Sequence, residues 1–374
     1  MRLLFTTAPL SGHLFPMVPL AWAARAVGHE VLVATTANFV PTVLGTGLPA
    51  VSWGPVADFV GMVADEPPID ADNVPQRRYA HGRAFGRIAR SSLPGARQVM
   101  SAWKPDLVIC ERAEFAGPFA AAANDVPYAV FHWGVPALEE YRAAAAEELS
   151  DVPGFSALPA PIETMNPWPL GMRLPFATAH QSVRSIAYNG EASLPEWLLQ
   201  PARRPRVCVT FGTLLPRVAA LGLRSVVAPM LARLAGLGVE LCLAVDNDVL
   251  AQWPELTESA TVAGRMPLGQ VLPSCDLIVN HGGQGTVLTA LAAGCPQLVL
   301  PHMDDQFDNA AAVVKAGAGM SLSLDEFNPA AVAERCETLL GDPGFGRVAA
   351  DVATRIEAHP SPVEIVDLLA KLAA

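Results

Sequence analysis

A glycine-rich segment in the second half of the chain has the composition of an anion-binding turn. The apolar run 276–280 indicates a buried strand, and it ends in residues 281–286, His-Gly-Gly-Gln-Gly-Thr. A helix-like stretch, 287–294, follows, so unpaired backbone amides at its start can bind an anion. His281 and Thr286 add donors, and the glycines let a diphosphate approach the backbone closely. Alone, these residues also fit a tight turn with a capping threonine and a buried histidine.

Carboxylates and an amide follow the next apolar strand of the chain. Because neighbouring parallel strands end at the same edge of a sheet, this segment should face the same crevice as the glycine-rich turn. Asp305 and Gln306 are the candidates for hydrogen bonds to sugar hydroxyls. For Asp304 and Asp308 we expect only a solvated cap of a helix that begins at about Asn309.

The first turn of the chain, Ser11-Gly12-His13, places an imidazole after an apolar, strand-like run. Imidazole titrates near neutrality and can accept a proton from an attacking hydroxyl. Taken alone, a histidine after Ser-Gly is more often a turn or cap residue. The anion-binding turn in the other half of the chain favours the role of general base for His13.

Both halves of the chain open with the same order of elements. Strand, helix and strand are predicted at 2–7, about 16–27 and 29–34 in the first half, and at 206–211, about 219–237 and 239–245 in the second. This alternation is typical of an open, mostly parallel sheet, and a single core stops growing beyond ~250 to 300 residues. We therefore predict an α/β protein with two Rossmann-like βαβ domains.

Proline, glycine and paired arginines interrupt the periodicity between the halves. The predicted first domain is 1–188, the linker 189–205 and the second domain 206–360. After a break rich in proline, residues 361–374 carry apolar side chains at helical spacing, which predicts an amphipathic terminal helix.

Composition narrows the class of protein. The 374 residues are 51% hydrophobic and 16% charged, and the net charge is −11 without a lysine- or arginine-rich run, which argues against nucleic-acid binding. No apolar stretch is long enough to span a membrane or to form a signal peptide, so we expect a cytoplasmic protein without stable membrane insertion. The six cysteines lack metal-ligand spacing, and we expect reduced core residues.

Four segments together resemble the nucleoside-diphosphate-sugar glycosyltransferases of actinobacterial natural-product pathways, those of macrolide and polyketide antibiotics. These segments are 12–21, 28–31, 281–286 and 301–310, and the likeness covers nearly the whole chain. It implies the GT-B fold, in which two Rossmann-like domains face each other across a deep cleft. It also implies inversion at the anomeric carbon without a metal or other cofactor. In the family, the terminal helix crosses back onto the first domain.

The resemblance also implies the catalytic roles. His13 lies where the family has its general base. The acid that orients this base follows a Pro-Asp-apolar strand, and here that position is Glu111, where the family commonly has aspartate. Because the extra methylene changes the reach of the carboxylate, Glu114 is an alternative, and so is a surface role for Glu111.

Donor binding is implied for residues of both halves. Thr213 matches a residue that meets the diphosphate, and Arg265 and Met266 lie where the family holds the nucleobase through backbone groups, although the usual tryptophan is absent. The expected donor-binding residues are Gly12, Thr213, Arg265, Met266, His281, Gly283, Gln284, Gly285, Thr286, Asp305 and Gln306.

The acceptor is expected in the first domain, along irregular segments at about 53–80, 111–135 and 151–177. The candidate lining residues are Phe59, Phe115, His132, Trp133, Phe155 and Trp168. Singly, each of them fits an ordinary core position at least as well.

Two other patterns bear on a metal site and on a nicotinamide cofactor. Asp246 and Asp248 have the spacing of a metal-nucleotide site, but we expect a polar turn. The first turn lacks the three-glycine fingerprint of a nicotinamide dehydrogenase.

The sequence thus predicts a glycosyltransferase that moves a deoxysugar from a dTDP donor to a hydroxyl of an apolar aglycone. The alternatives are a catalytically idle accessory subunit that binds sugar nucleotides, and a nucleotide-sugar epimerase of the same architecture. The sequence is also compatible with a homodimer.

Overall fold

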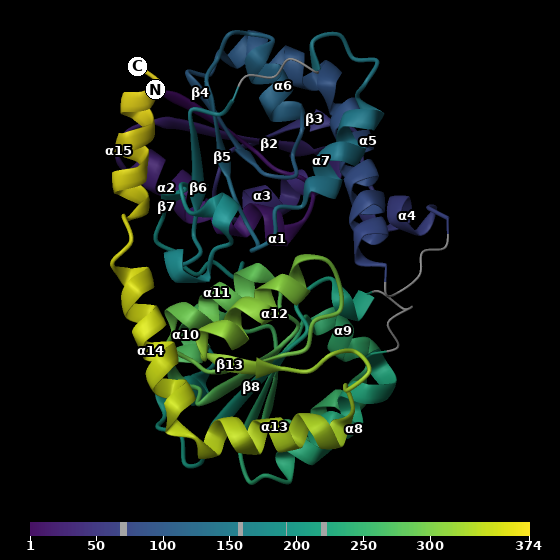
Figure 1. Ribbon diagram of the computed structural model, residues 1–374, viewed down its shortest axis with the longest axis vertical. Coiled ribbons are helices and arrows are strands. Elements are labelled where there is room, and N and C mark those ends of the chain that lie inside the picture. Colours follow the sequence, from purple (N-terminus) through teal and green to yellow (C-terminus); the bar gives the residue numbers. More distant parts are fainter. Residues whose placement is uncertain (68–72, 156–159, 192, 218–222) are drawn as a thin grey trace.

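The computed structural model describes residues 1–67, 73–155, 160–191, 193–217 and 223–374. It contains two parallel sheets, one in each half of an elongated molecule (Figure 1). The first residues of the predicted helix 219–237 lie outside the described residues, as do parts of the predicted segments 53–80, 151–177 and 189–205.

The first sheet has seven parallel strands in the order β3-β2-β1-β4-β5-β6-β7. Its strands are β1 (Arg2–Thr6), β2 (Glu30–Thr36), β3 (Ala50–Gly54), β4 (Leu107–Glu111), β5 (Tyr128–Phe131), β6 (Glu163–Asn166) and β7 (Gln181–Ser182). Its helices are α1 (Ser11–Leu14), α2 (Val18–Ala26), α3 (Val40–Gly45), α4 (Phe59–Ala64), α5 (Val74–Trp103), α6 (Ala116–Ala122) and α7 (Glu139–Glu148). The strand order reverses between β1 and β4, which is where Rossmann-like sheets open a binding crevice.

The second sheet has six parallel strands in the order β10-β9-β8-β11-β12-β13. Its strands are β8 (Arg206–Thr210), β9 (Glu240–Ala244), β10 (Val262–Gly264), β11 (Leu277–Asn280), β12 (Gln297–Val299) and β13 (Gly319–Ser321). Its helices are α8 (Leu223–Ala235), α9 (Asn247–Gln252), α10 (Leu268–Val271), α11 (Gln284–Ala292), α12 (Asp305–Ala316), α13 (Pro329–Gly341) and α14 (Pro343–Glu357). Here the order reverses between β8 and β11, so each domain has its own crevice.

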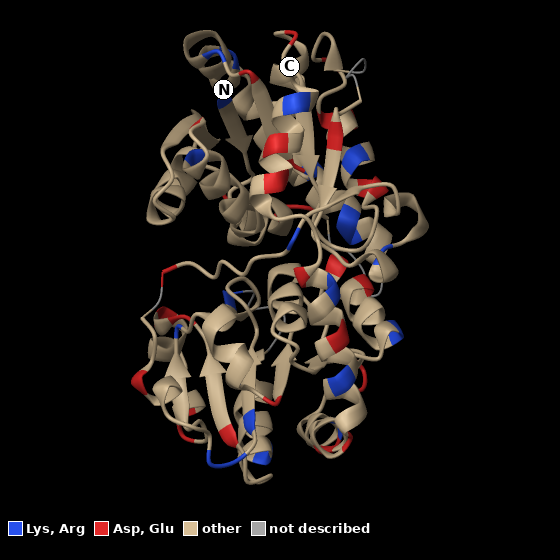
Figure 2. Cartoon of the chain, turned by 90° about the vertical axis from the view of Figure 1, so that its left-hand side faces the viewer, with Lys and Arg blue, Asp and Glu red and all other residues tan. Residues whose placement is uncertain are grey.

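Burial explains why these short apolar runs form strands. Every residue of β4, β8 and β11 is buried, as expected for parallel strands that have helices on both faces. The predicted α/β fold with two Rossmann-like domains is confirmed. Figure 2 shows acidic and basic residues interspersed along both halves of the chain. No helix in the described part of the chain is long and apolar enough to span a membrane.

Helix α12 corrects the prediction for the segment after β12. The helix begins at Asp305 rather than at about Asn309, and Asp304 is buried at 7% exposure instead of capping the helix in solvent. Asp304 accepts a hydrogen bond from the Tyr141 hydroxyl at 2.8 Å and contacts the His81 ring. Both partners come from the first domain, more than 160 residues away in the chain, so local sequence could not indicate them.

The two domains pack against each other through apolar and polar contacts. Val135, Trp168 and Met172 of the first domain belong to one buried cluster with residues of α11, α12 and α14. Beside it, the guanidinium of Arg78 donates to Asp308 at 2.5 Å. The domains therefore share a core as well as a crevice.

The terminal helix α15 (Pro362–Leu372) lies on the first domain although it follows the last helix of the second (Figure 1). A capping box between Ser361 and Glu364 starts it. Ile365, Val366 and Leu369 are buried in the core formed by α2 and the first sheet. The chain thus connects the domains twice.

This packing predicts unequal effects of two leucine truncations in α15. Leu369 is 1% exposed and Leu372 is 45% exposed. Leu369→Ala should lower the free energy of unfolding by about 2 to 5 kcal/mol, because it leaves a cavity in the core. Leu372→Ala is the matched control and should change it by less than about 0.5 kcal/mol. Denaturant unfolding measures both, and equal losses would mean that α15 does not pack as described.

Candidate functional site

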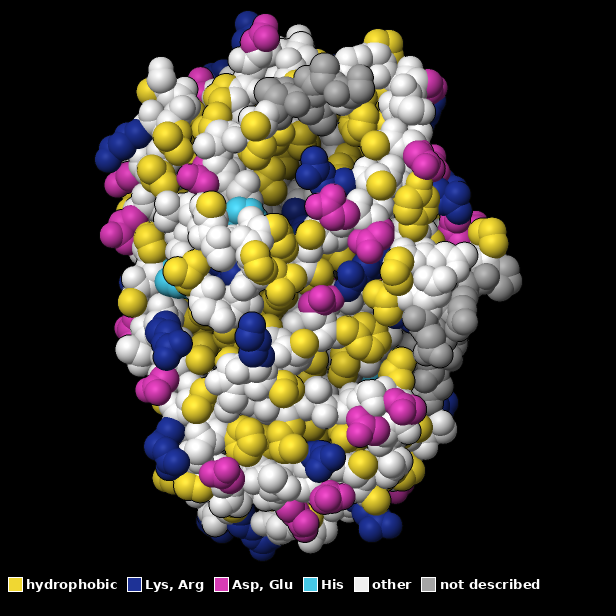
Figure 3. All heavy atoms as spheres, in the orientation of Figure 1, with side chains coloured by type: hydrophobic (Ala, Val, Ile, Leu, Met, Phe, Trp, Pro, Cys, Tyr) yellow, Lys and Arg dark blue, Asp and Glu magenta, His cyan; other side chains and the backbone are white. Residues whose placement is uncertain are grey.

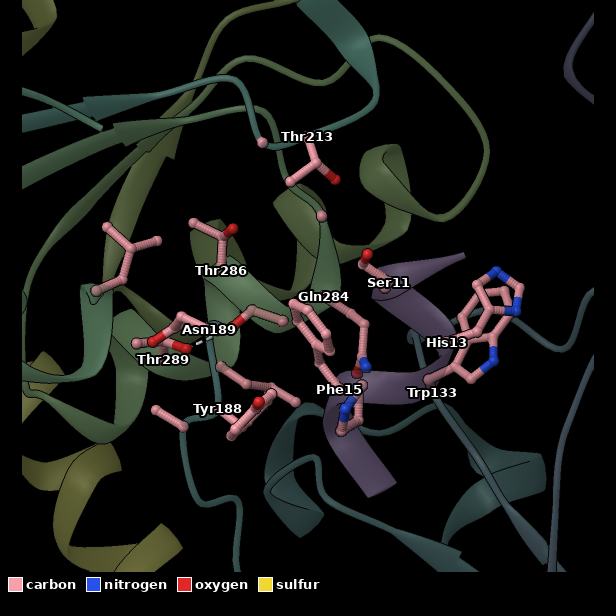
Figure 4. Close-up of a pocket in the computed structure, with 18 of the residues that line it drawn as sticks. Ser11, His13, Phe15, Trp133, Tyr188, Asn189, Thr213, Gln284, Thr286 and Thr289 are labelled. Atoms are coloured by element: carbon pink, nitrogen blue, oxygen red, sulfur yellow. Dashed lines mark hydrogen bonds between the residues drawn. The ribbon is translucent and has the colours of Figure 1, made fainter. Parts of the chain in front are cut away.

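A cavity of about 660 Å³ lies between the two sheets and is lined by both domains. Figure 4 shows Ser11, His13 and Phe15 on one side, and Thr213, Gln284 and Thr286 on the other. The cavity walls include the loops after β1, β8 and β11, which are strands at the two points where the strand order reverses. The fold therefore brings the predicted turns of both halves into one site.

All of the predicted donor-binding residues line this cavity. They are Gly12, Thr213, Arg265, Met266, His281, Gly283, Gln284, Gly285, Thr286, Asp305 and Gln306. Their contact with a donor remains a prediction.

His13 and Glu111 form a hydrogen-bonded pair at the carboxyl ends of β1 and β4. Because β1 and β4 are paired in parallel with Thr6 beside Cys110, the residues that follow them emerge side by side. The His13 Nδ1 lies 2.9 Å from the Glu111 Oε1. With Nδ1 bound to the carboxylate, Nε2 is the ring nitrogen left to accept a proton.

Glu111 is completely buried, and four groups donate to its carboxylate. Besides His13, they are the amides of Ala8 at 3.2 Å and Ala113 at 2.7 Å, and the indole of Trp133 at 2.7 Å. Burial opposes the charge, but His13, Trp133 and the Ala113 amide together hold the pKa of Glu111 below its usual value. The carboxylate is thus ionised and fixed in orientation.

Glu114 does not contact His13. It accepts hydrogen bonds from the Thr6 hydroxyl at 2.7 Å and from the amides of Ala116 and Gly117 at 2.8 Å each. Burial raises its pKa to about 7. Of the two candidate acids, the structure therefore places only Glu111 against the imidazole.

The turn between β11 and α11 presents the start of a helix to the cavity. Gly283 is the N-cap of α11 and provides no side-chain cap, so the first amides of the helix have no intrahelical partner. A Cβ on Gly283 would lie 2.4 Å from the His281 ring, and one on Gly212, which has φ of +67°, would lie 2.6 Å from it. Both glycines are thus required for the ring to pack here.

Two buried polar atoms of this turn lack a hydrogen-bond partner within the described residues. They are the His281 Nδ1 and the Gln284 Nε2. Burial, and less strongly His302, lowers the pKa of His281 to about 3, so its ring is neutral. Buried polar groups are normally paired, and both side chains line the cavity. They suit a ligand with oxygen atoms.

Asp305 and Gln306 differ in how many hydrogen bonds their side-chain oxygens accept from the protein. The Gln306 Oε1 accepts hydrogen bonds from the amides of His302 at 2.9 Å and Met303 at 3.1 Å, which fixes the preceding loop. Asp305 accepts a hydrogen bond from the Asn309 amide group at 2.7 Å. Burial nevertheless raises the pKa of Asp305 to about 6. The Asp305 carboxylate therefore accepts fewer hydrogen bonds from the protein than the Gln306 oxygen does.

Asp246 and Asp248 are ion-paired. Arg217 donates to Asp246 at 3.0 Å and to Asp248 at 2.7 Å, and Arg265 donates to Asp246 at 2.7 Å. Within the described residues, no group of three or more histidines, cysteines, aspartates or glutamates has the geometry to hold a metal ion. The two aspartates thus have arginine partners in this structure.

Of the predicted acceptor-binding residues, only Trp133 lines the large cavity. The others lie elsewhere because their rings pack in cores of the first domain or at the domain interface. Phe59 stacks on Phe85, Phe115 borders a second cavity of about 10 Å³, Phe155 packs against Phe119, His132 contacts Arg112, and Trp168 is buried between the domains.

Several cavity residues were not predicted from the sequence. Tyr188 and Asn189, which adjoin the start of the predicted linker, line the cavity, as does Phe15. Arg112, which lies behind the cavity wall and donates to the Trp133 carbonyl, was also missed, although a charged residue beside Glu111 at the end of an apolar strand was a usable signal. The contact between Glu111 and the Trp133 indole had no such signal, because 22 residues separate them.

Comparison with known proteins agrees with this geometry. The family models named "Erythromycin biosynthesis protein CIII-like" match the chain with an N-terminal domain at residues 22–212 and a C-terminal domain at 228–372. The L-demethylnoviosyl transferase of Streptomyces niveus is 38% identical over 99% of this chain and 98% of its own.

Two solved structures are similar over nearly the whole chain. The spinosyn rhamnosyltransferase SpnG in complex with thymidine diphosphate has a TM-score of 0.85 and 30% identity, and covers 99% of this chain and 100% of its own. SsfS6, a Streptomyces glycosyltransferase also in complex with thymidine diphosphate, has a TM-score of 0.83 at 30% identity and covers 99% of both chains. The chain therefore belongs to the erythromycin biosynthesis protein CIII-like family and is a glycosyltransferase of the GT-B fold.

Proposed function

We propose that this glycosyltransferase moves a deoxysugar from a dTDP donor to a hydroxyl of an apolar aglycone, with inversion, without a metal, and with His13 as the general base. The observation that carries the proposal is the His13–Glu111 pair, at 2.9 Å, because its His13 lines the same cavity as the turn at the start of α11. One structure of the similar SpnG holds thymidine diphosphate, and another holds spinosyn aglycone.

In the proposed reaction, the acceptor oxygen attacks the anomeric carbon while the His13 Nε2 removes its proton. The bond between that carbon and the β-phosphate oxygen breaks, and the nucleoside diphosphate leaves with the electron pair. Glu111 stabilises the imidazolium that forms, because its buried carboxylate is already bound to Nδ1. Attack from the face opposite the leaving group inverts the anomeric centre.

The leaving diphosphate gains negative charge in the transition state. In the proposed complex, the amides at the start of α11 and the His281 and Thr213 side chains bind its oxygens. Such fixed dipoles stabilise developing charge without reorganisation. They take the place of the divalent cation that other sugar-nucleotide enzymes use.

Replacement of His13 tests the base. His13→Ala should lower kcat by about 10²- to 10⁴-fold, the usual contribution of a positioned general base, and leave the Kd for thymidine diphosphate unchanged. His29→Ala is the control, because His29 precedes β2, pairs with the amino terminus and lies outside the cavity lining.

Product analysis of wild type then separates the alternatives. A nucleotide-sugar epimerase would convert the donor without acceptor, and an idle accessory subunit would bind thymidine diphosphate but release none from a dTDP-sugar. Unchanged turnover in His13→Ala would remove His13 from the mechanism.

Chelation tests the role of dipoles in place of a metal. Activity should survive an excess of EDTA, because the turn before α11 supplies donors for the diphosphate and both candidate aspartates are paired with arginine. The measurement is the initial rate before and after chelator and after added magnesium. Loss of activity that magnesium restores would assign Asp246 and Asp248 to a metal.

Asp305→Asn tests the proposed contact of Asp305 with the donor sugar. The variant should lose about 10- to 100-fold in kcat/KM, the value of a hydrogen bond to a charged group. It should nevertheless be more stable than wild type at pH 7. The pKa of Asp305 is about 6 in the folded protein and ~3.9 in an unfolded chain, so ionisation destabilises the folded state as pH rises through this window.

Thermal unfolding between pH 4 and 8 measures this difference. The stability gained in Asp305→Asn should be full above about pH 6 and disappear below about pH 4. A variant that is less stable than wild type by the same amount at every pH would contradict the burial argument.

A further inference from the structure

Trp133 contacts both members of the catalytic pair. Its indole N–H donates to the Glu111 Oε2 at 2.7 Å, while His13 is bound to the other oxygen of the same carboxylate. Its ring centre lies 4.4 Å from that of the His13 imidazole, with the planes inclined by 56°. Figure 4 shows the two rings side by side at the edge of the cavity. The indole thus borders the imidazole and fixes its partner.

Burial limits the contact that Trp133 can make with a ligand. Its exposure is 4%, so most of the ring is covered by protein. Its other neighbours belong to the apolar cluster that includes Phe85 and Tyr141. A ring buried in this way can hold Glu111 and His13 in position, but it offers little surface to an acceptor.

Arg112 holds Trp133 in place. Its Nη1 donates to the carbonyl of Trp133 at 2.7 Å and to that of Pro136 at 2.8 Å, and lies 3.1 Å from the His132 Nε2. The guanidinium also lies over the Trp133 ring, 5.3 Å from its centre. This one side chain therefore fixes the backbone of the loop after β5 and packs on the indole that the loop carries.

We propose that Trp133 is a positioning residue of the glycosyl transfer: its N–H fixes the Glu111 carboxylate, and through it the His13 ring with Nε2 facing the cavity. The inference rests on the proposed role of His13. It assigns Trp133 a function different from the acceptor wall that the sequence predicted. The indole acts on turnover, through the orientation of the base, and does not bind the acceptor.

The loss of the indole N–H sets the sign of the pH effect, because the charged groups around the pair stay in place. Arg112 follows Glu111 in the chain, Glu114 lies on the same loop, and Asp305 faces the pair from α12 across the interface. These groups remain when Trp133 is replaced. Loss of the N–H removes a positive dipole end from the carboxylate, so the pair as a whole binds a proton more tightly. The acidic limb of the kcat/KM profile should therefore move to higher pH.

Trp133→Phe is the test, because it removes the N–H and keeps an aromatic ring. We expect kcat to fall about 10- to 100-fold, the value of a hydrogen bond to a charged group, with both KM values within about twofold of wild type. Trp22→Phe is the matched control: Trp22 also donates one hydrogen bond, to the Thr46 carbonyl at 3.0 Å, but it lies outside the cavity. The control should keep both the kcat and the pH profile of wild type.

A second variant separates the loss of the N–H from a change in the shape of the side chain. A benzothienylalanine at position 133, introduced by site-specific incorporation, keeps the bicyclic shape and replaces only the N–H by sulfur. The variant should still unfold cooperatively, at a lower temperature than wild type because the buried Glu111 carboxylate loses one of its four hydrogen bonds. Its Kd for thymidine diphosphate should match wild type, while kcat and the acidic limb should change as in Trp133→Phe.

Three outcomes would overturn the proposal. A raised acceptor KM with unchanged kcat would make Trp133 an acceptor wall. A lower kcat with an unmoved acidic limb would leave only a structural role. Wild-type kinetics in both variants, with His13→Ala inactive, would overturn the positioning role alone, whereas an active His13→Ala would overturn the proposed base as well.

Discussion

The buried carboxylate of Glu111 is the constraint on which the first half of the site depends. An ionised group without solvent exposure is stable only when it is fully hydrogen-bonded, and the donors here come from three separate segments: the turn after β1, the end of β4 and the loop after β5. These segments are neighbours because the strand order reverses between β1 and β4. The same bonds that make the charge tolerable also aim the imidazole at the cavity.

The second domain lines the other side of the cavity with a helix start and neutral polar groups. Its contribution is the start of α11, a neutral His281 and an uncharged amide, all of which suit an anion without introducing a competing base. Asp305 is the exception, a carboxylate that burial makes reluctant to ionise. In the proposed mechanism, His13 on one side removes the proton and the dipoles on the other side stabilise the leaving group. Figure 3 shows that the outer face, by contrast, mixes charges of both signs with apolar side chains.

The strands and the polar turns that follow them were predictable, because apolar runs that end in Ser-Gly-His or His-Gly-Gly are local signals. The sequence could predict the partner of His13 only as a choice between two carboxylates, since Glu111 ends β4, Glu114 follows it, and no local pattern shows which one contacts the imidazole. The acceptor-binding residues stay a prediction, because aromatic side chains in irregular segments pack equally well in a core, as Trp168 does. The burial of Asp304 depends on contacts with the other domain, and no local pattern carries such information.

The loop after β5 joins the two halves of the site into one hydrogen-bonded path. Trp133 reaches Glu111, and two residues later the amide of Val135 donates to the Asn309 side chain at 3.0 Å. Asn309 in turn donates to Asp305 at 2.7 Å and to the carbonyl of Gly282 at 2.9 Å, the residue next to the N-cap of α11. A displacement of one domain relative to the other must therefore strain this loop or break one of its bonds. Since the loop also carries the indole that donates to Glu111, the geometry of the His13–Glu111 pair depends on the same contacts that hold the second-domain side of the cavity in place.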